Sequence, residues 1–241
     1  MKKIVNYQPI GEIEVRTSRN CNGIRYSVSE SCARITVAPH LLKNLFPLPA
    51  DKIDWFLQNK EKIQKQTSAK QFYSPENQID TFSFKIQFTP EPKLTDKFSA
   101  QLKDNILTVR FPPEIDFKTA KNQAVIKNIV KHFLTLEAKR ILPQKLAELA
   151  VLHGFKFSNI KISSAKKRWG SCNGKKSISL SCYLLFLPEN LIDMILLHEL
   201  CHTEQMNHGE KFYARLRKIV PNLAELEQER KKLEKRILGL Y

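Results

Sequence analysis

Short segments that alternate apolar and polar side chains dominate the first half of the chain, and β-branched residues are frequent in them. Both features are typical of strands. The strand-like segments span residues 12–16, 24–28, 33–37, 81–88 and 106–111. A polar helix with an apolar stripe is expected among them, over residues 51–65. This pattern predicts a strand-rich region over residues 1–118.

The pattern changes to helical spacing from about Thr119 onward. Apolar side chains recur every three or four positions as far as Gly154, which predicts a long helix. Because proline lacks an amide hydrogen, Pro143 is expected to kink or restart this helix. The change of pattern predicts a second, mainly helical region over residues 119–241.

Two short alternating segments follow the long helix, over residues 159–163 and 177–182. The loop between them contains Asn173-Gly174, so these segments are expected to form a β-hairpin. Three helices are then expected to finish the chain. Their predicted starts are Pro188, Asn207 with Glu210 three residues later, and Asn222 with Glu225 in the same relation.

The sharpest chemical feature is the sequence His198-Glu199-Leu200-Cys201-His202. Histidines four residues apart lie on one face of a helix and can share a metal ion, while the glutamate beside them can take a proton from a metal-bound water. The surrounding residues are apolar nearly all round this helix, so the three polar groups are costly to bury unless something binds them. The competing interpretation is a pair of hydrogen-bonded core histidines.

A catalytic zinc ion usually takes three protein ligands and keeps a fourth position for water. His208 follows a short connection and is expected at the start of the next helix, where its ring can reach the first two histidines. Glu225 and Glu227 are weaker candidates, because they fall on the polar face of the last helix. The sequence therefore predicts one Zn²⁺ held by His198, His202 and His208.

Composition limits the class of protein. A hydrophobic fraction of 42% supports a buried core, and the five cysteines include no Cys-x-x-Cys pair, which favours a reducing cytoplasm over a disulfide framework. No secretory signal and no apolar segment long enough for a membrane span is present. The formal net charge is +16, with 22 basic and 11 acidic side chains in residues 119–241. This excess favours nucleic acid or nucleotides as partners, although solvated lysines explain it equally simply.

Four residues near the motif are candidate substrate contacts. Arg168 and Trp169 lie in a basic loop, where the arginine can bind an oxyanion and the tryptophan is either a core anchor or a stacking surface. Ser179 lies on the polar face of a strand that can pair with an extended peptide as a sheet edge. Tyr213 can stabilise developing negative charge.

Several of these motifs occur together in an order that resembles the YgjP-like (SprT-related) zinc metallopeptidases. The shared stretches are Arg168-Trp169-Gly170-Ser171-Cys172, Leu187-Pro188-Glu189, the His-Glu-Leu-Cys-His motif, Asn207-His208-Gly209 and Phe212-Tyr213. Gly209 stands where that family often has serine. The resemblance implies a zincin-like α+β fold, with three histidine ligands and Glu199 as general base.

We therefore expect a zinc-dependent hydrolase that cleaves peptide bonds in a peptide or protein substrate. The first alternative keeps the metal and hydrolyses nucleoside triphosphates as a pyrophosphatase, an activity ascribed to one relative in the family. The second alternative is a nucleic-acid-associated binding module with a structural metal, which the basic C-terminal half favours.

Overall fold

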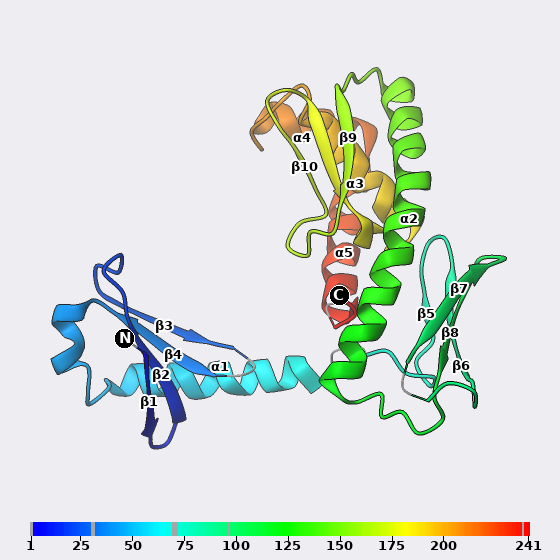
Figure 1. Cartoon of the computed structure of the whole chain (residues 1–241). Helices are drawn as coiled ribbons and strands as arrows, with labels where there is room; N and C mark the ends of the chain where they lie inside the picture. Colours follow the sequence, from blue (N-terminus) through cyan, green and yellow to red (C-terminus); the bar gives the residue numbers. More distant parts are fainter. Residues whose placement is uncertain (1, 30–31, 69–71, 96, 238) are drawn as a thin grey trace. The chain divides into compact units, whose positions relative to one another are not determined.

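The structure is a computed structural model that describes residues 2–29, 32–68, 72–95, 97–237 and 239–241. The chain forms two compact units, residues 1–70 and 71–241 (Figure 1). This boundary differs from the sequence-based boundary at residue 118. The difference arises because the strands between residues 79 and 111 share one hydrophobic core with the helices that follow them, rather than with the N-terminal strands.

The first unit is a four-stranded sheet with one helix. Its elements are β1 (Lys2–Tyr7), β2 (Gly11–Thr17), β3 (Ile24–Val28), β4 (Ala33–Val37), η1 (Pro39–Asn44) and α1 (Ala50–Ser68). The strand order is β1-β2-β4-β3, and β2 and β4 run parallel. The predicted strands and helix are therefore confirmed. Strand β1 was not predicted, because most of its side chains are exposed and its sequence shows little alternation.

The second unit begins with another four-stranded sheet, in the order β5-β6-β8-β7. Its strands are β5 (Ile79–Asp80), β6 (Lys85–Pro90), β7 (Ser99–Lys103) and β8 (Ile106–Phe111). The predicted strand over residues 81–88 begins only at Lys85. Thr81 forms a turn instead, in which its hydroxyl accepts a hydrogen bond from the Phe84 amide at 2.9 Å.

Helix α2 (Ala120–His153) is continuous, so the expectation that Pro143 restarts it is wrong. Leu134, Ala138, Leu142 and Leu146 form an uninterrupted buried stripe on both sides of the proline. Burial of this stripe in the core stabilises the helix enough to offset the one backbone hydrogen bond that proline removes. As predicted, the helix ends at Gly154, whose positive φ of 75° suits a glycine C-cap.

The second sheet of this unit corrects the predicted hairpin. Strands β9 (Asn159–Ser163) and β11 (Ser177–Ser181) are parallel neighbours, and the strand order is β10-β11-β9. The hairpin joins β10 (Gly170–Cys172) to β11 through the Asn173-Gly174 turn. The short strand β10 was missed, and it turns the connection into a crossover between parallel strands. It also makes β11 central, so the predicted edge strand is not an edge.

Three helices complete the unit: α3 (Glu189–Cys201), α4 (Glu210–Ile219) and α5 (Leu223–Ile237), with the short helix η2 (Cys182–Phe186) before them. Helix α3 begins at Glu189, directly after Pro188 at the N-cap, which confirms a start near Pro188. Asn207 does not cap α4, because the chain enters this helix through Gly209 without a side-chain cap. No described helix is long and apolar enough to cross a membrane. The α+β prediction, with a long helix, a β-hairpin and C-terminal helices, is confirmed.

Candidate active site

Helix α3 carries the His-Glu-Leu-Cys-His motif in the interior of the second unit. Its apolar residues are buried on nearly every side, and Leu191, Leu196 and Leu200 are fully inaccessible to solvent. The helix contacts α2, β10, α4 and α5. These contacts from several directions fix its orientation about its own axis and its position along that axis. His198 and His202 therefore project from one defined face, one turn apart.

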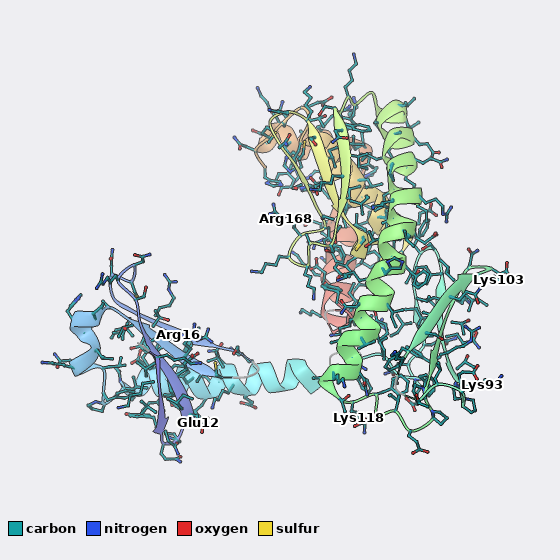
Figure 2. All side chains as sticks on the ribbon, viewed as in Figure 1. Glu12, Arg16, Lys93, Lys103, Lys118 and Arg168 are labelled. Carbon is teal, nitrogen blue, oxygen red and sulfur yellow. The ribbon has the colours of Figure 1, made fainter. Side chains whose placement is uncertain are left out.

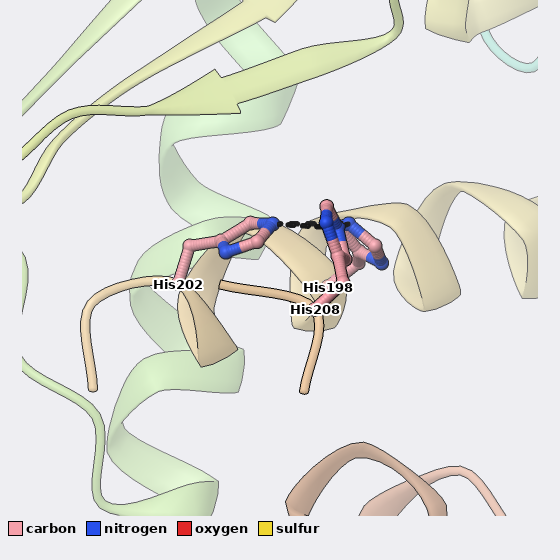
Figure 3. Close-up of side chains that lie close together, drawn as sticks. All are labelled: His198, His202 and His208. Carbon is pink, nitrogen blue, oxygen red and sulfur yellow. Dashed lines mark hydrogen bonds between the residues drawn. The ribbon is translucent and has the colours of Figure 1, made fainter. Parts of the chain in front are cut away.

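Three imidazole rings meet at this face (Figure 3). The Nε2 atom of His202 lies 3.2 Å from that of His198 and 3.1 Å from that of His208, and the remaining pair is 3.0 Å apart. His208 comes from the connection between α3 and α4, just before the first turn of α4. In the part of the chain that the structure describes, these residues form the one histidine, cysteine or carboxylate cluster with metal-ligand spacing.

The tautomer of His202 leaves a lone pair at the centre of the cluster. His202 Nδ1 lies 3.1 Å from the Gln205 carbonyl oxygen, which can only accept, so Nδ1 carries the proton and Nε2 is free in the neutral ring. Burial, followed by the neighbouring His202 and His208, lowers the pKa of His198 to about 4. Burial also lowers the pKa of His202. Both rings are thus neutral at pH 7, as metal binding requires.

Phe212 holds the three rings from one side. Its ring centroid lies 4.9 Å from His198, 4.6 Å from His202 and 4.9 Å from His208, and the side chain is fully buried. The prediction of a metal site did not give this residue a role. Phe212 lies four residues after His208 in one of the stretches shared with the family, but its role beside the three rings appears only once α4 packs on α3.

Glu199 is a buried carboxylate beside the cluster. Its side chain is 5% exposed, and burial raises its pKa to about 7 while the Arg168 charge opposes the shift. Its Oε2 atom has no hydrogen-bond partner among the described residues. Gly170 of β10 provides the room, because a Cβ built there would lie 2.6 Å from Cγ and Oε1 of Glu199. Gly170 is a second functional position that the sequence analysis left without a role.

The cluster has the donors and the spacing that a zinc ion requires. Imidazole nitrogens bind zinc at about 2.0–2.1 Å, and two such ligands at a tetrahedral angle lie about 3.4 Å apart. The observed separations of 3.0–3.2 Å are close to this value. Three mutual Nε2 contacts cannot all be hydrogen bonds, since each nitrogen carries either a proton or a lone pair. The unpartnered Glu199 oxygen likewise suits a water that needs a hydrogen-bond acceptor.

The predicted substrate contacts are spread over different faces. Arg168 is exposed on the loop between β9 and β10 (Figure 2). Trp169 packs against the core, and its indole N–H donates to Glu234 of α5. Ser179 alternates along β11 with the buried Ile178 and Leu180, so it lies on the opposite sheet face from them. Gly170 pairs with Leu180, so the Cβ direction of Gly170 points to the same buried sheet face as Leu180. Glu199 lies in that direction, and Ser179 therefore lies on the opposite face of the sheet from Glu199.

Tyr213 lies closer to the cluster. Its ring centroid is 6.2 Å from that of His208, and the Arg217 guanidinium stacks over it at 5.6 Å. The remaining histidines, His40, His132 and His153, lie outside the cluster, as expected from the sequence.

Comparisons with known proteins identify a family for this chain. A search of the curated proteins found no match. Among solved structures, the metallopeptidase zymogen of Pyrococcus abyssi abylysin is 23% identical, with a TM-score of 0.36, over 40% of this chain and 98% of that chain. The zymogen of Methanocaldococcus jannaschii jannalysin is 29% identical, with a TM-score of 0.34, over 37% and 93%. The family model of the YgjP-like metallopeptidase domain matches residues 25–235, and the chain therefore belongs to the YgjP-like metallopeptidase family.

Proposed function

We propose that this metallopeptidase uses one zinc ion, held by His198, His202 and His208. The observation that carries the proposal is the convergence of three Nε2 atoms within 3.2 Å of one another beside a buried carboxylate. A zinc ion, when bound, supplies a Lewis acid and lowers the pKa of its water. Neutral imidazoles present the nitrogen lone pairs that bind it, and the three Nε2 atoms converge on one point.

Glu199 is the proposed general base. Its carboxylate lies next to the histidines and has one oxygen without a partner among the described residues. It accepts the proton of the attacking water and passes that proton to the leaving amine. A pKa near 7 suits both directions of transfer at neutral pH. Arg168 and Tyr213 remain candidate contacts for the substrate carbonyl or its flanking residues.

The free edge of β10 is the proposed binding surface for the peptide backbone. The Trp169 carbonyl accepts a hydrogen bond from the Ser181 amide, and the Asn173 amide donates one to the Ser177 carbonyl. The alternation of an antiparallel pair therefore directs the N–H and C=O groups of Gly170 and Cys172 outward. An extended peptide can add to these groups as a further strand. Since Gly170 touches Glu199, this edge runs directly past the catalytic carboxylate. It replaces β11, and with it Ser179, in the original prediction.

The cysteines support a proposal for the cellular setting. All five are free thiols in the structure, which suits the reducing cytoplasm that we propose for this enzyme. The catalytic chemistry is assigned to residues 119–241, since every proposed ligand and the general base lie there.

The test compares wild type, Glu199→Gln and Glu225→Gln, the last being the same substitution at an exposed carboxylate of α5. Metal content is measured together with hydrolysis of a peptide library and of nucleoside triphosphates. We expect one zinc ion per chain in all three proteins. Peptide cleavage should fall by about 10²–10⁴-fold in Glu199→Gln alone, the contribution typical of general acid–base catalysis.

Three results would overturn the proposal. Unchanged peptide hydrolysis by Glu199→Gln would remove the general base. Glu199-dependent hydrolysis of nucleotides without peptide cleavage would establish the pyrophosphatase alternative. Nucleic-acid binding that falls steeply with salt, without any hydrolysis, would establish the binding module.

A further inference from the structure

A cavity of about 300 Å³ opens between the loop before β10 and helix α5. Its walls include Trp169, Tyr183 and Tyr241, whose rings contact one another with centroids 4.8 Å apart for the tyrosine pair and 6.3 Å for Trp169 and Tyr241. Tyr183 is 3% exposed, and Trp169 is further fixed by its hydrogen bond to Glu234. The aromatic wall is therefore rigid.

Cations from two separate elements surround this wall. Lys166, Lys167 and Arg168 come from the loop, and Lys235 comes from α5. All four are exposed. Glu234 carries the one carboxylate side chain among the described residues that line the cavity, and it is paired with Arg230 at 2.5 Å. Within the described part of the chain, the four cations have no ion-pair partner of their own. We refer to this cavity as the cationic pocket.

The cationic pocket lies beside the catalytic centre. Arg168 precedes Gly170 by two residues, at most about 7 Å of extended chain. A second hollow of about 240 Å³ shares Ala165, Arg168 and Trp169 with the pocket. It passes Gly170 on the sheet face that carries Ser179, opposite to the face on which Glu199 lies. Gly170 in turn touches Glu199. A peptide that follows the edge of β10 therefore brings the side chain two or three positions from its scissile bond to the cationic pocket.

We propose that the cationic pocket is a specificity subsite that takes an acidic side chain, aspartate or glutamate, two or three residues from the scissile bond. Four exposed cations without partners attract a carboxylate, and the aromatic walls pack against its methylene groups. The basic loop thereby gains a role in choosing the peptide. This inference rests on the proposed peptidase function and names the substrate class of the same site.

The test uses fluorogenic peptides that differ at one position, with Glu, Gln or Lys at the second or third residue on either side of the scissile bond. We expect wild type to prefer Glu over Gln at one of these positions by about tenfold in kcat/KM, with the preference declining as salt rises to 1 M. Lys235→Glu should lower the Glu-to-Gln ratio of kcat/KM by about tenfold and should make the Lys peptide the preferred substrate. Lys166→Gln combined with Lys167→Gln should lower the ratio in the same direction.

Lys103→Glu is the matched control, an equal change of charge at an exposed residue of β7 in the same unit (Figure 2). It should leave the ratio at its wild-type value. Equal cleavage of Glu and Gln peptides by wild type would refute the subsite while leaving the peptidase function intact. Absence of cleavage of every peptide would instead refute the peptidase function. If Lys235→Glu weakened nucleic-acid binding without moving the peptide ratio, the cationic pocket would be a phosphate site and the inference would fail.

Discussion

Gly170→Ala tests how the catalytic carboxylate is held. The new Cβ would lie 2.6 Å from Cγ and Oε1 of Glu199 and 2.7 Å from Cδ. Non-bonded carbon atoms prefer about 3.5–4.0 Å, so the carboxylate or the strand must move by about 1 Å. A misplacement of about 1 Å at a catalytic group can cost about 10²-fold in rate. We therefore expect kcat to fall by about 10²-fold, about 2.7 kcal/mol of transition-state stabilisation.

The same variant should keep its zinc, because the three atoms nearest to the new Cβ all belong to Glu199. Steady-state kinetics on one peptide, with metal content and melting temperature measured on the same preparation, separate these effects. Gly174→Ala is the matched control, since a Cβ at this turn position meets nothing within 4 Å. Wild-type kcat in Gly170→Ala would refute the steric reasoning. Loss of zinc in Gly170→Ala would show that β10 supports the metal ligands instead of the base.

Three further predictions concern the metal, its aromatic support and the first unit. Zinc at 100 times its Kd should stabilise the protein by about 2.7 kcal/mol, which raises the melting temperature by about 5–11 °C for a unit of this size. His208→Ala should abolish this shift in a thermal scan with and without chelator, and a shift that survived would exclude His208 as a ligand. Phe212→Leu should weaken zinc binding by about 10–100-fold, as loss of a residue that supports metal ligands typically does. Phe56→Leu, at an equally buried site of the first unit, should leave the zinc affinity unchanged. Equal effects of the two substitutions would argue against a direct role of Phe212 in holding the histidines. Hydrogen bonds from Lys2 and two arginines lower the pKa of Glu14 from 4.5 to about 2, so its contribution to stability is complete above pH 4.5 and is lost as the pH falls toward 2. In Glu14→Gln this loss of stability at low pH should vanish, and stability at neutral pH should be lower than in wild type. Unfolding is followed by Trp55 fluorescence in a background that lacks the other tryptophan. An unchanged dependence of stability on pH would contradict this role of Glu14.

Two residues of the histidine cluster could be predicted to lie together because their proximity depends on local geometry. A helix brings residues four positions apart to one face whatever surrounds it, so His198 and His202 are neighbours by spacing alone. His208 needed one further assumption, a short connection that returns the chain. Gly170 and Phe212 could not be predicted in the same way. Both residues lie in stretches that resemble the family, but their roles depend on β10 and α4 packing against α3, which local spacing does not predict.

The strand pairing shows the same limit in the fold. Residues 159–163 and 177–181 have the same alternation whether they pair parallel or antiparallel, because side-chain period is equal in both. The observed parallel pairing is set by β10, which has only three residues and carries a glycine. This correction moves the free edge from β11 to β10 and thereby changes which residues an extended substrate can meet. A small error in strand order thus altered the predicted substrate site while leaving the predicted ligands untouched.

Burial acts on the two kinds of catalytic group in opposite directions, and this explains how so apolar a helix can carry them. It lowers the pKa of His198 to about 4 and raises that of Glu199 to about 7. Both shifts favour the neutral forms, so α3 can pack into the core without burying several full charges at once. The same neutral imidazoles are the forms that bind zinc. The apolar surroundings that fold α3 therefore also prepare its histidines to act as ligands.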